Sequence, residues 1–264
     1  MPRHKRAAVP LDHIDRHAGP AFGLADDLGA FTSEWHCHRH HQLLYAARGA
    51  MQLETADGRW LLPPQRMAWI RGGTEHRVTA AGPVELRTVY MAPALTPGPG
   101  GACVVMEVPP LAREMLAEAM RWGPDQDSRG AVPRAFFAAL AALAGEWASA
   151  PASFSLPGAR TPELARAMEH ALAHLDSAGL SAVAHVAHVS EKTLARRFES
   201  ECRMTWRQWL HRARMLTAME RLAAPGASAT RVALDVGFAS QAAFTRAFTA
   251  FTGESPGAYK KRGS

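Results

Sequence analysis

The apolar positions of the first 91 residues occur in short runs, each bounded by Gly, Pro or an Asp-Gly pair. The clearest runs are QLLYAARG, AMQLETADGRWLLPP, RMAWIRGG, HRVTAAG and VELRTVYM. Runs of this length between turn residues predict β-strands, and their close spacing favours an antiparallel sheet or barrel. The Ala-Asp-Gly at 56–58 lies between two such runs and predicts a hairpin turn.

The rest of the chain has mainly helical periodicity. Segment 111–122 predicts a helix with one apolar side, formed by Leu111, Met115, Leu116, Ala119 and Met120. Segment 136–147, FFAALAALAGEW, is apolar nearly all round, which indicates a helix buried in a core or a dimer interface. A further helix is predicted to start at Thr161-Pro162-Glu163, which supplies an N-cap, a proline at the first helical position and an acid in the first turn.

Proline and glycine mark the predicted boundaries between these regions. They are concentrated in APALTPGPGG at 92–101 and in SAPASFSLPGAR at 149–160. We therefore predict a two-domain α+β protein, in which an N-terminal β domain with helices precedes a C-terminal all-α domain. The expected parts are a β domain at 1–100, a helical segment at 101–150, a linker at 151–160 and the all-α domain at 161–264.

Two segments of the helical region resemble each other, VAHVAHVSEKTLARRF at 183–198 and VALDVGFASQAAFTRAF at 232–248. The second segment has one additional residue before its serine, and with this insertion Ser190 corresponds to Ser240. Each segment has a short helix, a tight turn, a serine N-cap, and a second helix with apolar residues four and eight positions after the cap. This pattern predicts two helix-turn-helix units, whose second helices can lie in the major groove of DNA.

The helical period also predicts which side chains of the second helices face the groove. With serine as the cap, Leu194 and Phe198 face the core in the first unit, and Phe244 and Phe248 do so in the second. The predicted DNA-binding residues are Glu191, Lys192, Ala195, Arg196, Gln241, Ala242, Thr245 and Arg246. Arginine suits bidentate contact with guanine, and glutamine can pair with adenine.

The charge distribution agrees with DNA as the partner. The sequence pI is about 9.7, and residues 161–264 contain 14 Lys and Arg against 9 Asp and Glu. A basic excess in one domain favours a polyanionic partner. No apolar run approaches the roughly 20 residues of a membrane span, and the basic N-terminus lacks the apolar region of a secretory signal. With three widely spaced cysteines, we expect a reducing, cytoplasmic location.

At this point the C-terminal region resembles a known family. VALDVGFASQAAFTRAFTAFTGESPGAYKKR is similar to the signature of the AraC/XylS family of bacterial transcription regulators, and SEKTLARRFESECRMTWRQWLHRARMLTAMERL to that family's first helix-turn-helix and the helix that follows. The resemblance covers about 161–262 and implies two units bridged by a helix at about 206–222, entering grooves roughly 34 Å apart. One departure is His188, where the second unit has the usual glycine, Gly237.

The family's DNA-binding domain usually follows a sensor, often a cupin-like β-barrel. Residues 36–49 resemble the first cupin motif, with His36, His38, Gln42 and Gly49 in register, and GGTEHRV resembles the second motif, which ends at His76. Residues i and i+2 of a strand point to the same face, so His36 and His38 can share one ion. The resemblance implies a metal or effector site of His36, His38, Gln42 and His76, with Gln42 replacing the usual carboxylate.

Three imidazoles and an amide suit one divalent ion such as nickel, zinc, cobalt or iron. The run from Gln42 to His76 also resembles a set of AraC-type regulators that includes a nickel-responsive repressor of metal efflux. A small organic effector, or a barrel that serves only for dimerisation, remains the alternative. We expect His40 and His41 at the surface or a strand edge, Cys37 as a packed thiol, and Trp35 in the barrel core or its helix contacts.

The predicted function is therefore sequence-specific DNA binding for transcription regulation, with an effector sensed by the cupin-like domain. The expected partners are a double-stranded DNA operator, a second copy of the chain, and RNA polymerase if the protein activates. A metal-dependent cupin enzyme is a remote alternative, because it leaves the tandem DNA-binding module unexplained and lacks a carboxylate at Gln42. We thus expect no enzymatic activity and no membrane partner.

Overall fold

The computed structural model describes residues 11–17, 19–64, 66–149, 155–224 and 226–263. The chain forms two compact units, Met1–Thr55 with Leu62–Ser153, and Ala56–Leu61 with Phe154–Ser264. We call the first the β unit and the second the helical unit. The basic first ten residues and residues 151–154 of the predicted linker lie outside the described residues. The predicted order, a β-sheet domain followed by a helical domain, is confirmed, although the helical unit also contains strand residues.

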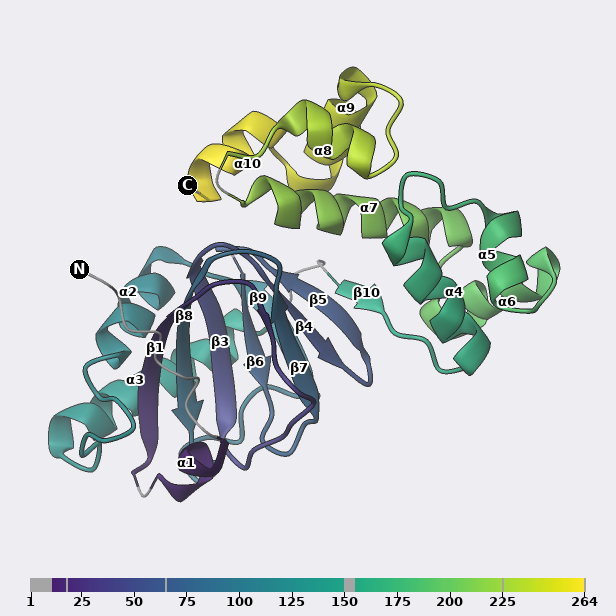
Figure 1. The fold of residues 1–264 in the computed structure, drawn as a ribbon. Coiled ribbons are helices and arrows are strands. Elements are labelled where there is room, and N and C mark those ends of the chain that lie inside the picture. Colours follow the sequence, from purple (N-terminus) through teal and green to yellow (C-terminus); the bar gives the residue numbers. More distant parts are fainter. Residues whose placement is uncertain (1–10, 18, 65, 150–154, 225, 264) are drawn as a thin grey trace. The chain divides into compact units, whose positions relative to one another are not determined.

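The strands of the β unit form antiparallel sheets (Figure 1). The larger sheet has the order β1-β8-β3-β6-β9, with bounds Ala21–Leu28, Val84–Met91, His41–Arg48, Arg66–Ile70 and Cys103–Glu107. In the smaller sheet, β7 (His76–Ala80) pairs with β4 (Met51–Thr55) and with β2 (Phe31–Thr32). Alternate side chains along β3 point to opposite faces of the larger sheet, so this strand contributes to two environments.

Two further strands belong to the helical unit by their contacts. Strand β5 (Gly58–Leu62) begins after a turn at 56–57, which confirms the predicted hairpin turn. It pairs antiparallel with β10 (Ser155–Pro157). The described part of the predicted linker thus contains a short strand. A side chain on Gly58 would meet the carbonyl oxygen of Leu156 at 2.5 Å, so this close pairing requires glycine.

The helices of the β unit are α1 (Leu11–Arg16), α2 (Pro110–Ala119) and α3 (Ala131–Trp147). Helices α2 and α3 cover one face of the larger sheet (Figure 1), where their buried residues join a core that includes Leu43, Trp69 and Val89. The predicted apolar side of α2 is partly wrong, because Leu111 is 53% exposed and the buried residues are Ala112, Leu116 and Ala119.

Helix α3 is buried on one face only, so a core that encloses it is not observed, whereas the predicted dimer interface stays a prediction. Its buried face consists of Pro133, Phe137, Leu140, Ala141 and Ala144. The exposed positions are mostly alanine and glycine, together with Val132, Arg134 and Glu146. Alanine is apolar by composition but small enough to remain at a surface, which explains the difference.

The helical unit consists of α4 (Pro162–Ala173), α5 (Leu180–Val186), α6 (Glu191–Cys202), α7 (Trp206–Leu222), α8 (Ala229–Asp235), α9 (Gln241–Thr252) and α10 (Pro256–Gly263). Helix α7 joins the α5–α6 and α8–α9 pairs (Figure 1) and has the predicted bounds. It starts with a capping box between Thr205 and Gln208. Among the described residues, no helix has the length and apolar character needed to cross a membrane.

Candidate functional site

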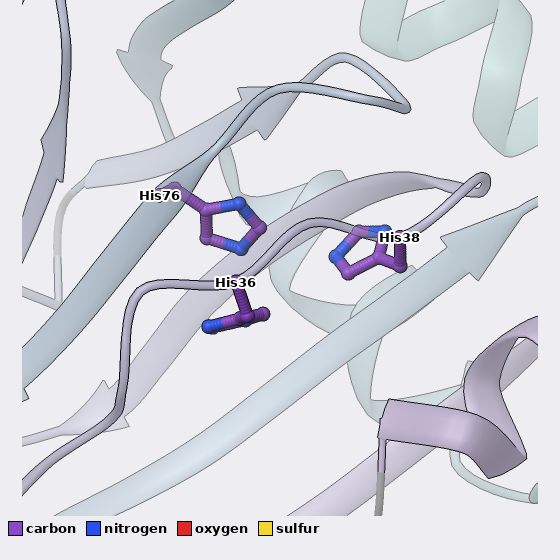
Figure 2. A group of neighbouring side chains, drawn as sticks. All are labelled: His36, His38 and His76. Atoms are coloured by element: carbon purple, nitrogen blue, oxygen red, sulfur yellow. The ribbon is translucent and has the colours of Figure 1, made fainter.

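The three predicted histidines converge inside the β unit (Figure 2). His76 begins β7, and its backbone forms an isolated bridge with His36, in which each N–H donates to the other residue's carbonyl at 2.9–3.0 Å. His38 follows in an irregular segment, and its carbonyl accepts from the N–H of Gly73 at 2.8 Å. One nitrogen of each imidazole lies within 4.8 Å of the others. His36 and His38 therefore meet as predicted, although they do not lie on a regular strand.

Backbone carbonyls fix the orientation of all three rings. The Nδ1 atoms of His36, His38 and His76 lie 2.8 Å from the carbonyl oxygens of Glu34, His40 and Thr74, respectively. A carbonyl only accepts, so each Nδ1 carries the proton and donates. In a neutral imidazole the lone pair is then on Nε2, which is the usual arrangement in histidine metal ligands.

Burial keeps two of these rings neutral. Burial lowers the pKa of His38, and lowers the pKa of His76 to about 4. Both are therefore uncharged at neutral pH and can donate a lone pair to a metal ion. Within the described part of the chain, the buried Nε2 of His76 has no hydrogen-bond partner. Because buried polar atoms are normally satisfied, this nitrogen indicates a missing partner at the site.

The fourth predicted residue, Gln42, lies beside the histidines on β3. Its Oε1 lies 3.1 Å from Nε2 of His38, and its Nε2 donates to Thr88 Oγ1 at 3.0 Å and to Tyr90 Oη at 3.2 Å. Sequence analysis did not identify Thr88 and Tyr90. A signal for them was present in the sequence. They are polar residues at alternate positions of the otherwise apolar end of β8, so both point to the same side of the sheet.

The chemistry of the donor set fits a divalent ion. Three imidazole nitrogens and one amide oxygen are neutral ligands that suit nickel, zinc, cobalt or iron(II). Two imidazole nitrogens that share a tetrahedral ion are only about 3.3 Å apart, as follows from metal–nitrogen bonds of about 2.0–2.1 Å. One nitrogen of each ring lies within 4.8 Å of the other two, so at most a modest side-chain movement reaches this spacing, and His36 is the least buried of the three.

Four neighbouring predictions are wrong. His40 and His41 are buried rather than at the surface or a strand edge. His40 packs near Asp15 and Phe22, and His41, at the start of the central strand β3, accepts from the N–H of Gly72 and lies against Trp69. Cys37 is exposed rather than packed, and Trp35 is 44% exposed rather than in the core. All four lie in or beside the irregular segment, where strand alternation does not apply.

The predicted DNA-binding residues lie together on the second helix of each helix-turn-helix unit. Glu191, Lys192 and Arg196 are exposed on α6, with Ala195 half-buried beside them. The same positions of α9 hold Gln241, Ala242 and Arg246, exposed, and Thr245, half-buried. The inward positions of both helices are fully buried, as predicted: Leu194, Phe198, Phe244 and Phe248. Each helix thus presents one polar face that a major groove can accommodate.

Serine side chains cap both helices. Ser190 accepts from the N–H of Thr193 in α6, and Ser240 accepts from the N–H of Ala243 in α9. A residue that sequence analysis missed is Thr230, whose hydroxyl donates to Oε1 of Gln241 at 2.9 Å. This bond holds the predicted adenine-reading amide in one orientation and leaves its NH₂ group free to donate.

Comparisons with known proteins identify both units. A model of the AraC-like ligand binding domain matches residues 21–117, and a model of a helix-turn-helix domain matches residues 183–262. The HTH-type transcriptional regulator NimR of Escherichia coli K12 is 28% identical over 252 residues, which cover 94% of this chain and 90% of NimR.

Two solved structures are also similar. The DNA-binding domain of AdpA, in complex with a target DNA, is 33% identical and covers 38% of this chain and 92% of its own, with a TM-score of 0.36. ToxT from Vibrio cholerae is 9% identical and covers 92% of this chain and 98% of its own, with a TM-score of 0.40.

Proposed function

This chain, which joins an AraC-like ligand-binding domain to a helix-turn-helix domain, is a DNA-binding transcription regulator of the AraC type, and we propose that its effector is a divalent metal ion held by His36, His38 and His76. The observation that carries this proposal is the set of three converging imidazoles, each with Nδ1 anchored to a carbonyl, so that Nε2 is the nitrogen that can bind an ion. Gln42 completes the proposed site. Nickel, zinc and cobalt are the first ions to test.

Metal occupancy influences DNA binding only if the ion binds one conformation of the protein better than another. The structure offers a connection from the histidine segment to the helices of the β unit. Asp15, in α1, accepts from the N–H of Arg39 at 2.8 Å, and Nδ1 of His40 lies 3.5 Å from its carboxylate. Two residues on, His17 contacts the carbonyl of Pro124 and the hydroxyl of Ser128, in the α2–α3 connection.

We expect this connection to transmit movement of the histidine segment to α2 and α3. A coupling of about 1–3 kcal/mol is typical, which corresponds to a change in DNA affinity of about 5- to 150-fold. Asp15→Asn weakens the connection without removing a proposed ligand. It should leave nickel affinity near wild type and reduce the effect of nickel on DNA affinity.

The β unit is also the proposed dimerisation module. The exposed face of α3 carries alanine and glycine along its middle, between Arg134 and Glu146, and two copies can approach closely there. Sedimentation should show a dimer at micromolar concentration, and Ala139→Glu should shift it toward monomer. A wild-type protein that is only monomeric, with and without DNA, contradicts this part of the proposal.

The central experiment is the metal content of the untagged protein after loading with nickel, zinc or cobalt. We expect close to one ion per chain in the wild type and loss of that ion in His38→Ala and in His76→Ala. His170 in α4 and His174 at its C-cap need a control, because their rings are 4.6 Å apart and such a pair can retain nickel by itself. The His170→Ala/His174→Ala variant should keep the ion.

DNA affinity is then measured with and without nickel on a fragment that the wild-type protein selects from random duplexes. A change in affinity that disappears in His38→Ala supports metal regulation. If the wild type retains no metal, or if the loss of metal leaves regulation unchanged, the proposed effector is wrong, and small organic compounds become the next candidates.

A further inference from the structure

The amide of Gln42 is held at both ends. Gln42 is buried on β3, opposite Tyr90 of the neighbouring strand β8. Its Nε2 reaches two hydroxyl groups, at 3.0 Å from Thr88 and 3.2 Å from Tyr90, and its Oε1 lies 3.1 Å from Nε2 of His38. The two ends of an amide have opposite hydrogen-bonding character, so its neighbours decide which end faces the histidines.

The hydroxyl of Thr88 determines which end of the Gln42 amide faces the histidines. It donates its only proton to the carbonyl oxygen of Leu43 at 2.9 Å, so its oxygen can only accept from Gln42. Rotating the amide by half a turn would bring Oε1 against an oxygen that has no proton to give. Thr88 is fully buried, so no water compensates for such a contact. The NH₂ end of Gln42 therefore faces Thr88, and Oε1 faces His38.

The position of the proton on the His38 ring, which faces Oε1 of Gln42, is also fixed by a backbone carbonyl. Nδ1 of His38 donates to the carbonyl of His40, which leaves a lone pair on Nε2. Nε2 of His38 and Oε1 of Gln42 thus face each other at 3.1 Å as two acceptors. The series from Thr88 through Gln42 to His38 ends on a backbone carbonyl at each side, Leu43 and His40, so the protons of these three side chains point away from the contact between Oε1 of Gln42 and Nε2 of His38. Two such acceptors repel one another unless a cation lies near both.

We infer that Thr88 and Tyr90 are positioning residues for metal binding, because their hydroxyls orient the amide of Gln42 so that its oxygen becomes a ligand. The inference rests on the proposed metal-sensing function and assigns a task to two residues that are not themselves ligands. Thr88 sets the direction of the amide, and Tyr90 adds a second acceptor for the same NH₂ group. Residues of this kind typically change metal affinity by about 10- to 100-fold when they are replaced.

The test compares nickel affinity, by competition with a chromogenic chelator, in wild type, Thr88→Val, Thr88→Ser, Tyr90→Phe and Gln42→Leu. Thr88→Val keeps the shape of the side chain but removes the hydroxyl, and it should bind nickel about 10- to 100-fold more weakly. Thr88→Ser restores the hydroxyl and should bind like wild type. Tyr90→Phe should have a smaller effect than Thr88→Val, because one acceptor for the NH₂ group remains.

The double variant Thr88→Val/Gln42→Leu distinguishes positioning from a general effect on the fold. If Thr88 acts through Gln42, the double variant should bind nickel no more weakly than Gln42→Leu alone. The melting temperature of each metal-free variant checks that folding is retained. If Thr88→Val binds like wild type, or if the two substitutions add, the inference is overturned while metal sensing stands. A wild-type protein that binds no nickel overturns the proposed function itself.

Discussion

The two helix-turn-helix units show how one motif tolerates different turns. Residues 191–200 of α6 and 241–250 of α9 have the same sequence of exposed, half-buried and buried positions. The turns also make equivalent backbone bonds, since the N–H of His188 donates to the carbonyl of His185 and the N–H of Gly237 to that of Leu234. Both residues have positive φ, 57° for His188 and 83° for Gly237. The inserted residue, Ala239, follows this shared turn.

The difference lies in what surrounds each turn. A side chain on Gly237 would meet the guanidinium of Arg214 at 2.6 Å and the carbonyl oxygen of Leu175 at 2.7 Å. Arg214 of α7 is itself hydrogen-bonded to that carbonyl, at 2.8 and 3.1 Å, so neither group can easily move. His188 is exposed and escapes this crowding. Backbone conformation alone thus permits histidine, and the packing of α7 is what requires glycine in the second unit.

The largest expected effect comes from adding a methyl group to the crowded turn. Gly237→Ala should destabilise the helical unit by about 2–4 kcal/mol, because it combines a left-handed backbone conformation with a steric clash. The matched change in the first unit, His188→Ala, should alter stability by less than about 1 kcal/mol. Urea unfolding followed by tryptophan fluorescence and circular dichroism measures both. Equal losses in the two variants would show that the crowding is not the cause.

The next largest effect is expected on DNA binding, from the arginine that occupies the same position in α6 and in α9. Arg196→Ala and Arg246→Ala should each weaken operator binding by roughly 1–3 kcal/mol and relax base preference in their own half of the site. The exposed Arg129 of the β unit provides a control for loss of charge alone. If either variant retains wild-type affinity and selectivity, while Arg129→Ala does too, the assignment of that helix face is incorrect.

A smaller effect on stability is expected from removing the backbone strain at His188, in the turn of the first helix-turn-helix unit. His188→Gly removes the cost of a positive φ, about 1–2 kcal/mol, but adds chain entropy to the unfolded state, about 0.5–1 kcal/mol. The net result should be a stabilisation of up to about 1.5 kcal/mol with unchanged DNA affinity. The melting temperatures of this variant and of the wild type, compared by thermal unfolding, test the prediction. A clear loss of stability would mean that the His188 side chain makes a contribution beyond the turn.

The smallest effect on DNA binding is expected from the hydrogen bond between Thr230 and Gln241 in the second helix-turn-helix unit. Thr230→Val frees the amide of Gln241 and should weaken DNA binding by about 0.5–1 kcal/mol, the contribution of one typical hydrogen bond. In a Gln241→Ala background the same change should have no effect. The corresponding residue of the first unit is Ser181, and Ser181→Ala should leave affinity unchanged. Fluorescence anisotropy of a labelled duplex resolves differences of this size.

Much of the helical unit could be predicted from the sequence, because its structure is determined by local chemistry. Helix α7 begins at a threonine cap and has the predicted bounds, and the serine caps and inward apolar residues of α6 and α9 lie where the helical period puts them. The histidine set was also predictable from motif spacing, since His36, His38 and His76 do converge. Caps and periodicity act over a few residues, so they can be read directly from the chain.

Only the tertiary structure decided what surrounds those residues. The burial of His40 and His41 and the contacts of Gln42 with Thr88 and Tyr90 depend on segments that are distant in the sequence, and the exposure of Trp35 and Cys37 does not follow from local periodicity. Gly237 is required because α7 brings Arg214 against it. Periodicity determines the direction of a side chain along its own element, whereas its neighbours come from cross-strand pairing and helix packing between distant parts of the chain.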